Sequence, residues 1–202
     1  MKQLLLVSDG LFHPPLPGRV TLRRFLTGLP GCALTVTRSL EKLPPGLERF
    51  DAMLLYFHHK QVTPAALHAL DQFVGAGGGL LAIHSATASF KSTPHYFELL
   101  GGRFTGHGKV APFQIVPSGE SPLFAGLPAF WLTDEVYLHE TQAGIQVHFT
   151  TRHAGQDVPV VWTWTYGRGR VCYAMPGHRS ATLADPHYQQ VLQRGLEWVW
   201  RS

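Results

Sequence analysis

Short apolar runs alternate with helix-like segments through the first half of this 202-residue chain. The runs cover residues 4–7, 33–37, 52–57 and 79–83, and the last two carry almost no polar side chain. Strands that are apolar on both faces are typical of a parallel sheet covered by helices on each side. The alternation therefore predicts an α/β fold of three layers, with a mostly parallel central sheet.

The second half of the chain is richer in predicted strands than the first. Helices are predicted at 19–29, 65–74 and 94–99, with a last one beginning at 185–186. The further strand candidates are 113–116, 135–139, 146–150, 159–165 and 171–175. This strand-rich half can carry an antiparallel extension. No repeat, low-complexity tract or linker divides the sequence, so one domain over residues 1–202 is expected.

Composition and charge argue against a nucleic-acid-binding protein and against a membrane-spanning one. The net charge is +4, but the basic residues are scattered and form no stripe with aromatic residues, which argues against a nucleic-acid partner. No apolar run approaches the roughly 18–20 residues of a membrane span, and no signal peptide is recognisable, so a cytoplasmic protein is expected. Cys32 and Cys172 lie in apolar runs and are interpreted as small buried hydrophobic residues.

The glycine cluster at 75–79 is not interpreted as a nucleotide loop. A dinucleotide fingerprint follows a strand and opens a helix. This cluster follows a predicted helix and precedes a predicted strand, which indicates a helix C-cap and a turn. NAD is therefore not expected as a cofactor.

Polar residues follow four of the apolar runs. Asp9 comes shortly after the first run, His58 follows 52–57, the pair His84 and Ser85 follows 79–83, and His178 comes shortly after 171–175. Ligands of open parallel α/β sheets bind beyond the carboxyl ends of the strands. These side chains are therefore candidates for one site.

Two more segments carry candidate site residues. His107 lies in a glycine-rich stretch, 101–108, which is interpreted as a loop where backbone can approach a ligand. If 135–139 forms a strand, Glu135, Tyr137 and His139 share one face. A carboxylate, a phenol and an imidazole on one face suit a polyol or a metal ion.

In this order, the segments resemble the ThuA-like (trehalose-utilisation) family. The matching stretches are GAGGGLLAIHSATASF (75–90), ELLGGRFTGHG (98–108), TDEVYLHE (133–140), PVVWTWTYGRGRVCYAMPGH (159–178) and DPHYQQVLQRGLEWV (185–199). The resemblance implies a flavodoxin-like fold similar to that of class I glutamine amidotransferases. Family members commonly carry a glycine- and histidine-rich stretch near the N-terminus, where this chain has residues 12–15, so the role of His13 stays open.

Class I glutamine amidotransferases carry a nucleophilic cysteine on a sharp strand-to-helix turn. The equivalent turn here contains His84 and Ser85 but no cysteine, so no glutaminase activity is expected. Ser85 could replace the nucleophile only with a base and an orienting acid, and His178 is the candidate base.

The resemblance implies an enzyme of carbohydrate metabolism that acts on a disaccharide or keto-sugar, as a hydrolase, lyase or isomerase. The candidate catalytic residues are His84, Glu135, His139 and His178, and the candidate substrate contacts are Asp9, His58, Ser85 and Tyr137. Zinc or manganese is the candidate cofactor, with His84, His107, His139 and His178 as ligands and Glu135 or Glu140 as ligand or general base.

Two alternatives stay open at this stage. The same residues could move protons without a metal, or the chain could be a non-catalytic sugar-binding or regulatory domain. A neutral polyhydroxylated ligand is expected, because no arginine fork or phosphate loop is evident. No membrane partner is expected, and a homo-oligomer is left open.

Overall fold

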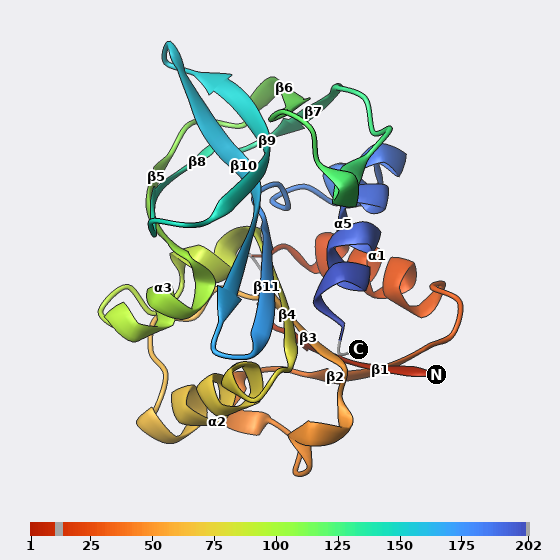
Figure 1. The fold of residues 1–202 in the computed structure, drawn as a ribbon, viewed down its shortest axis with the longest axis vertical. Helices are drawn as coiled ribbons and strands as arrows, with labels where there is room; N and C mark the ends of the chain where they lie inside the picture. Colours follow the sequence, from red (N-terminus) through yellow and green to blue (C-terminus); the bar gives the residue numbers. More distant parts are fainter. Residues whose placement is uncertain (11–13, 201–202) are drawn as a thin grey trace.

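A computed structural model describes residues 1–10 and 14–200 of the chain. The central sheet of the described part has nine strands in the order β2-β1-β3-β4-β11-β10-β9-β6-β7 (Figure 1). Its first five strands are β2 (Cys32–Thr37), β1 (Lys2–Ser8), β3 (Ala52–Tyr56), β4 (Gly79–Ile83) and β11 (Gly169–Ala174). Each of these strands is parallel to its neighbour. Every side chain of β3 and β4 is buried, as expected for strands covered on both faces.

The other strands of this sheet are antiparallel, so the expectation of a mostly parallel sheet is only partly correct. They are β10 (Gln156–Tyr166), β9 (Gln146–His153), β6 (Ala111–Pro117) and β7 (Phe130–Asp134). The cause lies in the connections. Only two residues join β9 to β10 and β10 to β11, and so short a link can form a hairpin but not a parallel crossover.

A small second sheet pairs β5 (Gly102–His107) with β8 (Tyr137–Thr141). The glycine-rich stretch 101–108 was expected to be a loop, and this expectation is wrong for 102–107. Pairing with β8 holds this segment extended despite its glycines, which shows tertiary pairing overriding local propensity. Glu135 was expected within a strand, but it lies between β7 and β8.

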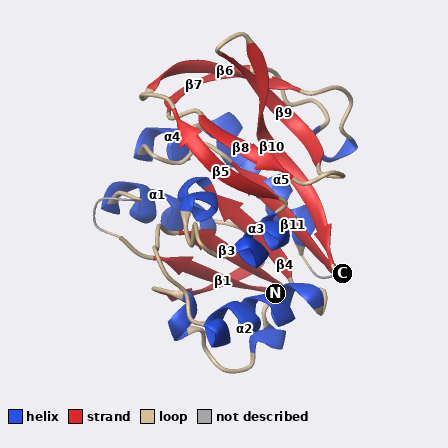
Figure 2. Cartoon of the chain, turned by 90° about the vertical axis from the view of Figure 1, so that its left-hand side faces the viewer, coloured by secondary structure: helices blue, strands red, loops and turns tan. Residues whose placement is uncertain are grey.

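Helices cover both faces of the parallel strands (Figures 1 and 2). One face carries α1 (Leu16–Thr27), α4 (Ser180–Ala184) and α5 (Pro186–Val199), and the other carries α2 (Pro64–Gly75) and α3 (Pro94–Leu100). Short 3-10 turns lie at Leu40–Lys42, Leu47–Arg49, His84–Ala88 (η3) and Pro122–Phe124. No sequence pattern predicted α4, β5 or β7.

Local sequence signals explain where the helices begin and end. The Thr63 hydroxyl accepts a hydrogen bond from the backbone N–H of Ala66 and caps α2, while Asp185 caps α5 in the same way. Helix α2 ends at Gly75, and Gly77 has a φ of 101° in the turn that leads to β4. The interpretation of the glycine cluster as a cap and turn is therefore confirmed.

Candidate functional site

The site lies beyond the carboxyl ends of four adjacent parallel strands. Because β1, β3, β4 and β11 are neighbours in the sheet, the residues that follow them come close together. His84 follows β4 directly, and the segment 175–178 follows β11. These two segments form the centre of the site.

His84 sits at a sharp corner of the backbone, where β4 passes into η3. Its φ of 49° lies in the left-handed region, which costs a residue with a side chain on the order of 1–3 kcal/mol. The His84 carbonyl accepts a hydrogen bond from the Tyr173 hydroxyl at 3.0 Å and lies 3.2 Å from Oγ1 of Thr87. These contacts hold the corner in a conformation that aims the imidazole toward the β7–β8 connection.

The imidazole of His84 is fully buried, and a hydrogen bond at Nδ1 sets its orientation. Its Nδ1 lies 3.0 Å from the carbonyl oxygen of Met175, which can only accept, so Nδ1 carries the proton and donates. In the neutral ring, Nε2 then carries the lone pair. The Tyr137 hydroxyl lies 3.1 Å from Nε2, and burial raises the pKa of Tyr137, so the phenol stays protonated and donates.

The segment after β11 is held by hydrogen bonds at successive residues. Besides Met175, the carbonyl of Pro176 accepts from the Tyr188 hydroxyl, and the carbonyl of Gly177 accepts from the Tyr56 hydroxyl at 2.6 Å. A Cβ atom on Gly177 would lie 2.8 Å from Cβ of His84, so only glycine allows this close approach. Hydrogen bonds thus hold the carbonyl groups of three successive residues of this segment.

A buried carboxylate, that of Asp134, joins this segment to the end of β7. Its Oδ1 accepts from the backbone N–H groups of Glu135 at 2.8 Å and His178 at 3.1 Å. Its Oδ2 accepts from the N–H of Arg179 at 3.3 Å. Asp134 thus places Glu135 and His178 side by side, although one follows β7 and the other follows β11.

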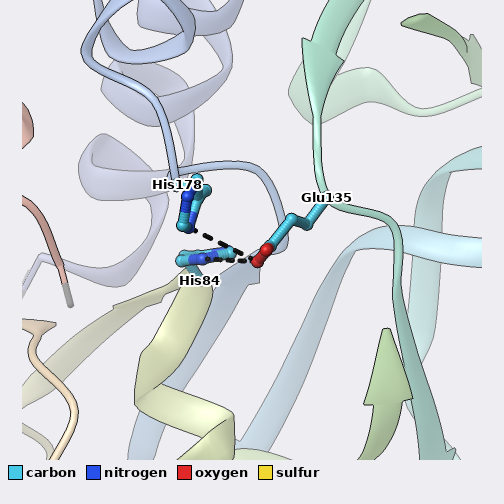
Figure 3. Close-up of side chains that lie close together, drawn as sticks. All are labelled: His84, Glu135 and His178. Carbon is cyan, nitrogen blue, oxygen red and sulfur yellow. Dashed lines mark ion pairs between the residues drawn. The ribbon is translucent and has the colours of Figure 1, made fainter. Parts of the chain in front are cut away.

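Glu135, His84 and His178 converge on one point (Figure 3). Oε2 of Glu135 lies 3.6 Å from Nε2 of His84 and 3.5 Å from Nδ1 of His178. One ligand atom from each residue lies within 4.8 Å of the other two. Among the described residues, Oε2 of Glu135 has no hydrogen-bond partner, although it is buried. A buried carboxylate oxygen that faces two imidazoles favours a bound cation or a shared proton.

A cleft of about 590 Å³ opens beside this cluster. Its volume lies within the range of roughly 300–1,000 Å³ that is usual for small-molecule sites. Polar side chains and the aromatic rings of Phe104 and Tyr137 share its walls. The lining residues are His58, Ala88, Lys91, Phe104, Gly106, His107, Glu135 and Tyr137.

Several residues that the sequence analysis proposed do meet at this cleft. His84, Glu135 and His178 form the cluster, and Tyr137 contacts His84. The half-exposed His107 places Nδ1 3.7 Å from Oε1 of Glu135, and the same atom lies 2.9 Å from the carbonyl oxygen of Gly108. His58 lines the cleft wall.

Other proposed residues lie outside the cluster. Nε2 of His139 lies 3.0 Å from Oγ1 of Thr87, and burial lowers the pKa of His139 to about 3. Glu140 forms an ion pair with Arg103 at the surface. The structure therefore does not bring His139 or Glu140 to the point where His84, Glu135 and His178 meet.

Ser85, Asp9 and His13 complete the proposed set. Ser85 is fully buried, and its hydroxyl has no hydrogen-bond partner among the described residues, so it is not paired with His178 there. Asp9 is partly exposed and lies 3.9 Å from the Arg19 guanidinium. His13 lies outside the described residues.

Sequence reasoning missed Asp134 and Lys91. The sequence does carry a signal for Asp134. Phe130 and Leu132 are apolar at alternate positions, and Asp134 is an acid at the next position of this alternation, directly before Glu135. Lys91 had none, because only the fold brings it beside Phe104 and His58 in the cleft.

These features define an α/β protein whose histidine and glutamate side chains meet beyond the carboxyl ends of its parallel strands. A family profile named ThuA and described as trehalose utilisation matches residues 4–199. The chain belongs to the ThuA family. A comparison with curated proteins finds no match.

Solved structures agree with this assignment at the level of the fold. A ThuA-like protein from Bacteroides uniformis is 21% identical, with a TM-score of 0.82 over 98% of this chain and 91% of its own. A ThuA-like protein from Parabacteroides merdae is 18% identical, with a TM-score of 0.82 over 98% and 89%. A Salmonella typhimurium protein described as cytoplasmic is 16% identical, with a TM-score of 0.74 over all of both chains. No helix in the described part of this chain is long and apolar enough to cross a bilayer.

Proposed function

We propose that the protein is an enzyme of carbohydrate metabolism that acts on a sugar or keto-sugar in the cleft beside Glu135. The observation that carries the proposal is the convergence of His84, Glu135 and His178 beside a cleft of suitable volume. The family description, trehalose utilisation, supports a carbohydrate as the substrate class. Hydrolysis, elimination and isomerisation of a sugar all use the proton transfers that such residues perform.

We further propose that His84, Glu135 and His178 hold a divalent metal ion, either zinc or manganese. Two imidazole nitrogens and one carboxylate oxygen match the ligand sets of catalytic metal sites that leave positions open for substrate. The hydrogen bond from Nδ1 of His84 to the Met175 carbonyl is the kind that orients a metal-binding histidine. When bound, the ion would polarise a sugar carbonyl or hydroxyl oxygen.

The residues around the cluster would contact the substrate and transfer protons. The Tyr137 hydroxyl donates a hydrogen bond to Nε2 of His84, and Tyr137 also lines the cleft. If Nε2 held a metal, this hydroxyl would be available to a substrate in the cleft. His107 is half exposed and reaches the other oxygen of Glu135. It is therefore placed to exchange a proton with a substrate hydroxyl.

A metal-free site is the second candidate, and the 3.1 Å contact between Tyr137 and His84 favours it. In this arrangement Nε2 of His84 accepts a hydrogen bond from the Tyr137 phenol, and Glu135 accepts protons from the substrate. A non-catalytic sugar-binding domain would use the same cleft without turnover.

Metal content tests these candidates directly. Protein purified without a histidine tag should contain about one divalent ion per chain, and Glu135→Gln should lose it. Glu140→Gln is the matched control, because Glu140 pairs with Arg103 at the surface and should keep the metal. Trace metal in the wild-type protein would instead favour the metal-free site.

Two further proposals concern chemistry and location. No glutaminase activity is expected, because the corner after β4 carries His84 and Ser85 where amidotransferases carry cysteine. A cytoplasmic location is supported by the two free cysteines, Cys32 and Cys172, since reduced thiols are typical of that compartment.

A further inference from the structure

A second hollow adjoins the cleft beside Glu135. It has a volume of about 320 Å³ and shares three lining residues, His58, Ala88 and Lys91, with the first cleft. Because these three residues line both hollows, one ligand can extend from the first cleft into the second hollow. We propose that the substrate is an acidic sugar whose carboxylate binds in the second hollow beside Lys60 and Lys91. This inference rests on the proposed function, because it places the reacting part of the sugar at the His84–Glu135–His178 cluster.

Four of the seven residues that line the second hollow are lysines or histidines. Its residues are His58, His59, Lys60, Ala88, Phe90, Lys91 and Ser92, and none of them is an acid. Lysine side chains are charged at neutral pH. The two acids whose charges act on His59 are Asp9 and Glu41. Neither lines the hollow, and Glu41 accepts hydrogen bonds from both the N–H and the hydroxyl of Thr63.

Lys91 lies at the boundary between the two hollows. Its Nζ atom lies 4.9 Å from the centre of the Phe104 ring, and Phe104 lines the first cleft. The ring face attracts the ammonium and holds it beside the passage. A carboxylate at the passage between the two hollows therefore meets a positive charge.

Hydrogen bonds hold the two walls of the second hollow together. The N–H of Phe90 donates to the carbonyl of His59 at 3.0 Å, and the N–H of His59 donates to the Ser89 hydroxyl at 3.1 Å. The Phe57 ring stacks on the His59 ring at 4.8 Å. These contacts fix the backbone of the two segments that form the second hollow.

The lining favours a carboxylate over a phosphate. Phosphate sites usually offer an arginine fork or the N-terminus of a helix. Neither hollow has an arginine in its lining. Two lysines supply compact point charges, which suffice for a singly charged uronic or aldonic acid.

The test compares D-glucuronate with D-glucose by calorimetric titration of the intact protein. Glucuronate should bind at least about tenfold more tightly, and the difference should shrink as salt screens the lysines. Lys91→Gln should remove most of this preference. Arg168→Gln is the matched control, since it removes the same charge from an exposed residue in the turn between β10 and β11.

Each contrary result has a distinct meaning. Equal affinity for the two sugars overturns the acidic-sugar inference but leaves the proposed function standing. If the preference for glucuronate persists in the variant Lys60→Gln and also in the variant Lys91→Gln, the carboxylate binds elsewhere and the inference is overturned. Tighter binding of glucose 6-phosphate than of glucuronate overturns the assignment to a carboxylate. If no sugar binds, the inference fails together with the sugar-processing role, whereas the metal content still tests the cluster separately.

Discussion

The carboxylate of Asp134 accepts a hydrogen bond from the backbone N–H of His178 at 3.1 Å, across 44 positions of sequence. The same oxygen accepts from the N–H of Glu135. One buried acid therefore fixes the backbone of two residues of the cluster, and it contributes to the site without reaching into the cleft.

Replacing Asp134 by asparagine should destabilise the protein and loosen the cluster. The amide NH₂ group would face the N–H of Arg179 as donor against donor, and a buried unsatisfied group of this kind costs about 1–3 kcal/mol. Urea unfolding measures the free energy, and elemental analysis measures retained metal. Asp157→Asn is the control, because that exposed acid pairs with Arg152 and should change stability by less than about 0.5 kcal/mol. Equal stability of the two variants would contradict the role given to Asp134.

Gly177→Ala should disturb the cluster more than the fold. The new Cβ would lie 2.8 Å from Cβ of His84, so the imidazole or the segment must shift by several tenths of an ångström. Metal affinity should fall by roughly 10–100-fold, the usual effect of disturbing groups that orient metal ligands. In the control Gly75→Ala, the added methyl group meets nothing within 4 Å and should leave metal affinity unchanged. An unchanged affinity in Gly177→Ala would show that the close approach does not set the ligand geometry.

The sequence predicted the parts of this site that depend on parallel strands. His84 and His178 follow neighbouring parallel strands. The carboxyl ends of such strands lie at one edge of the sheet, regardless of the conformation of the loops. The prediction for Glu135 had a different basis, namely that Glu135, Tyr137 and His139 would share one face of a strand. That reason was wrong, because β8 begins at Tyr137 and Glu135 precedes it.

The parts of the site that were not predicted depend on contacts between segments distant in the sequence. A register shift where β5 pairs with β8, between Phe104 and Gly106, is not visible in the sequence. His139 shares its strand with Tyr137, but it contacts Thr87 and Trp162 and stays outside the cluster. Alternation along a strand identifies which side chains share a face, but not how far each one reaches.

Ser85→Ala should leave stability almost unchanged. The Ser85 hydroxyl is buried without a hydrogen-bond partner among the described residues, so its removal relieves a desolvated polar group and leaves no donor unpaired. We expect a change in unfolding free energy within about 1 kcal/mol, and unchanged metal content. Neither the wild type nor the variant should release ammonia from glutamine. Ammonia release that disappears in Ser85→Ala would establish the serine as a nucleophile.

Acid should destabilise the fold through two buried histidines. Burial lowers the pKa of His139 to about 3 and that of His148 to about 4, whereas an unfolded histidine titrates near pH 6.5. The unfolded chain therefore binds more protons than the folded protein below about pH 6.5. The stability that the neutral rings provide is complete above that pH, and it is lost as the pH falls toward 3–4. Each ring should contribute a slope of up to about 1.4 kcal/mol per pH unit in that window.

Urea unfolding at pH 7.5, 5.5 and 4.5 would measure this slope, with the pH values chosen to lie about one unit or more apart across the window. His148→Gln should flatten the dependence on pH, because glutamine cannot take up the proton that the unfolded chain gains. His153→Gln is the matched control, since His153 lies at the end of β9 and is only partly buried. It should keep the wild-type slope. A slope that is the same in both variants would place the acid sensitivity in other groups.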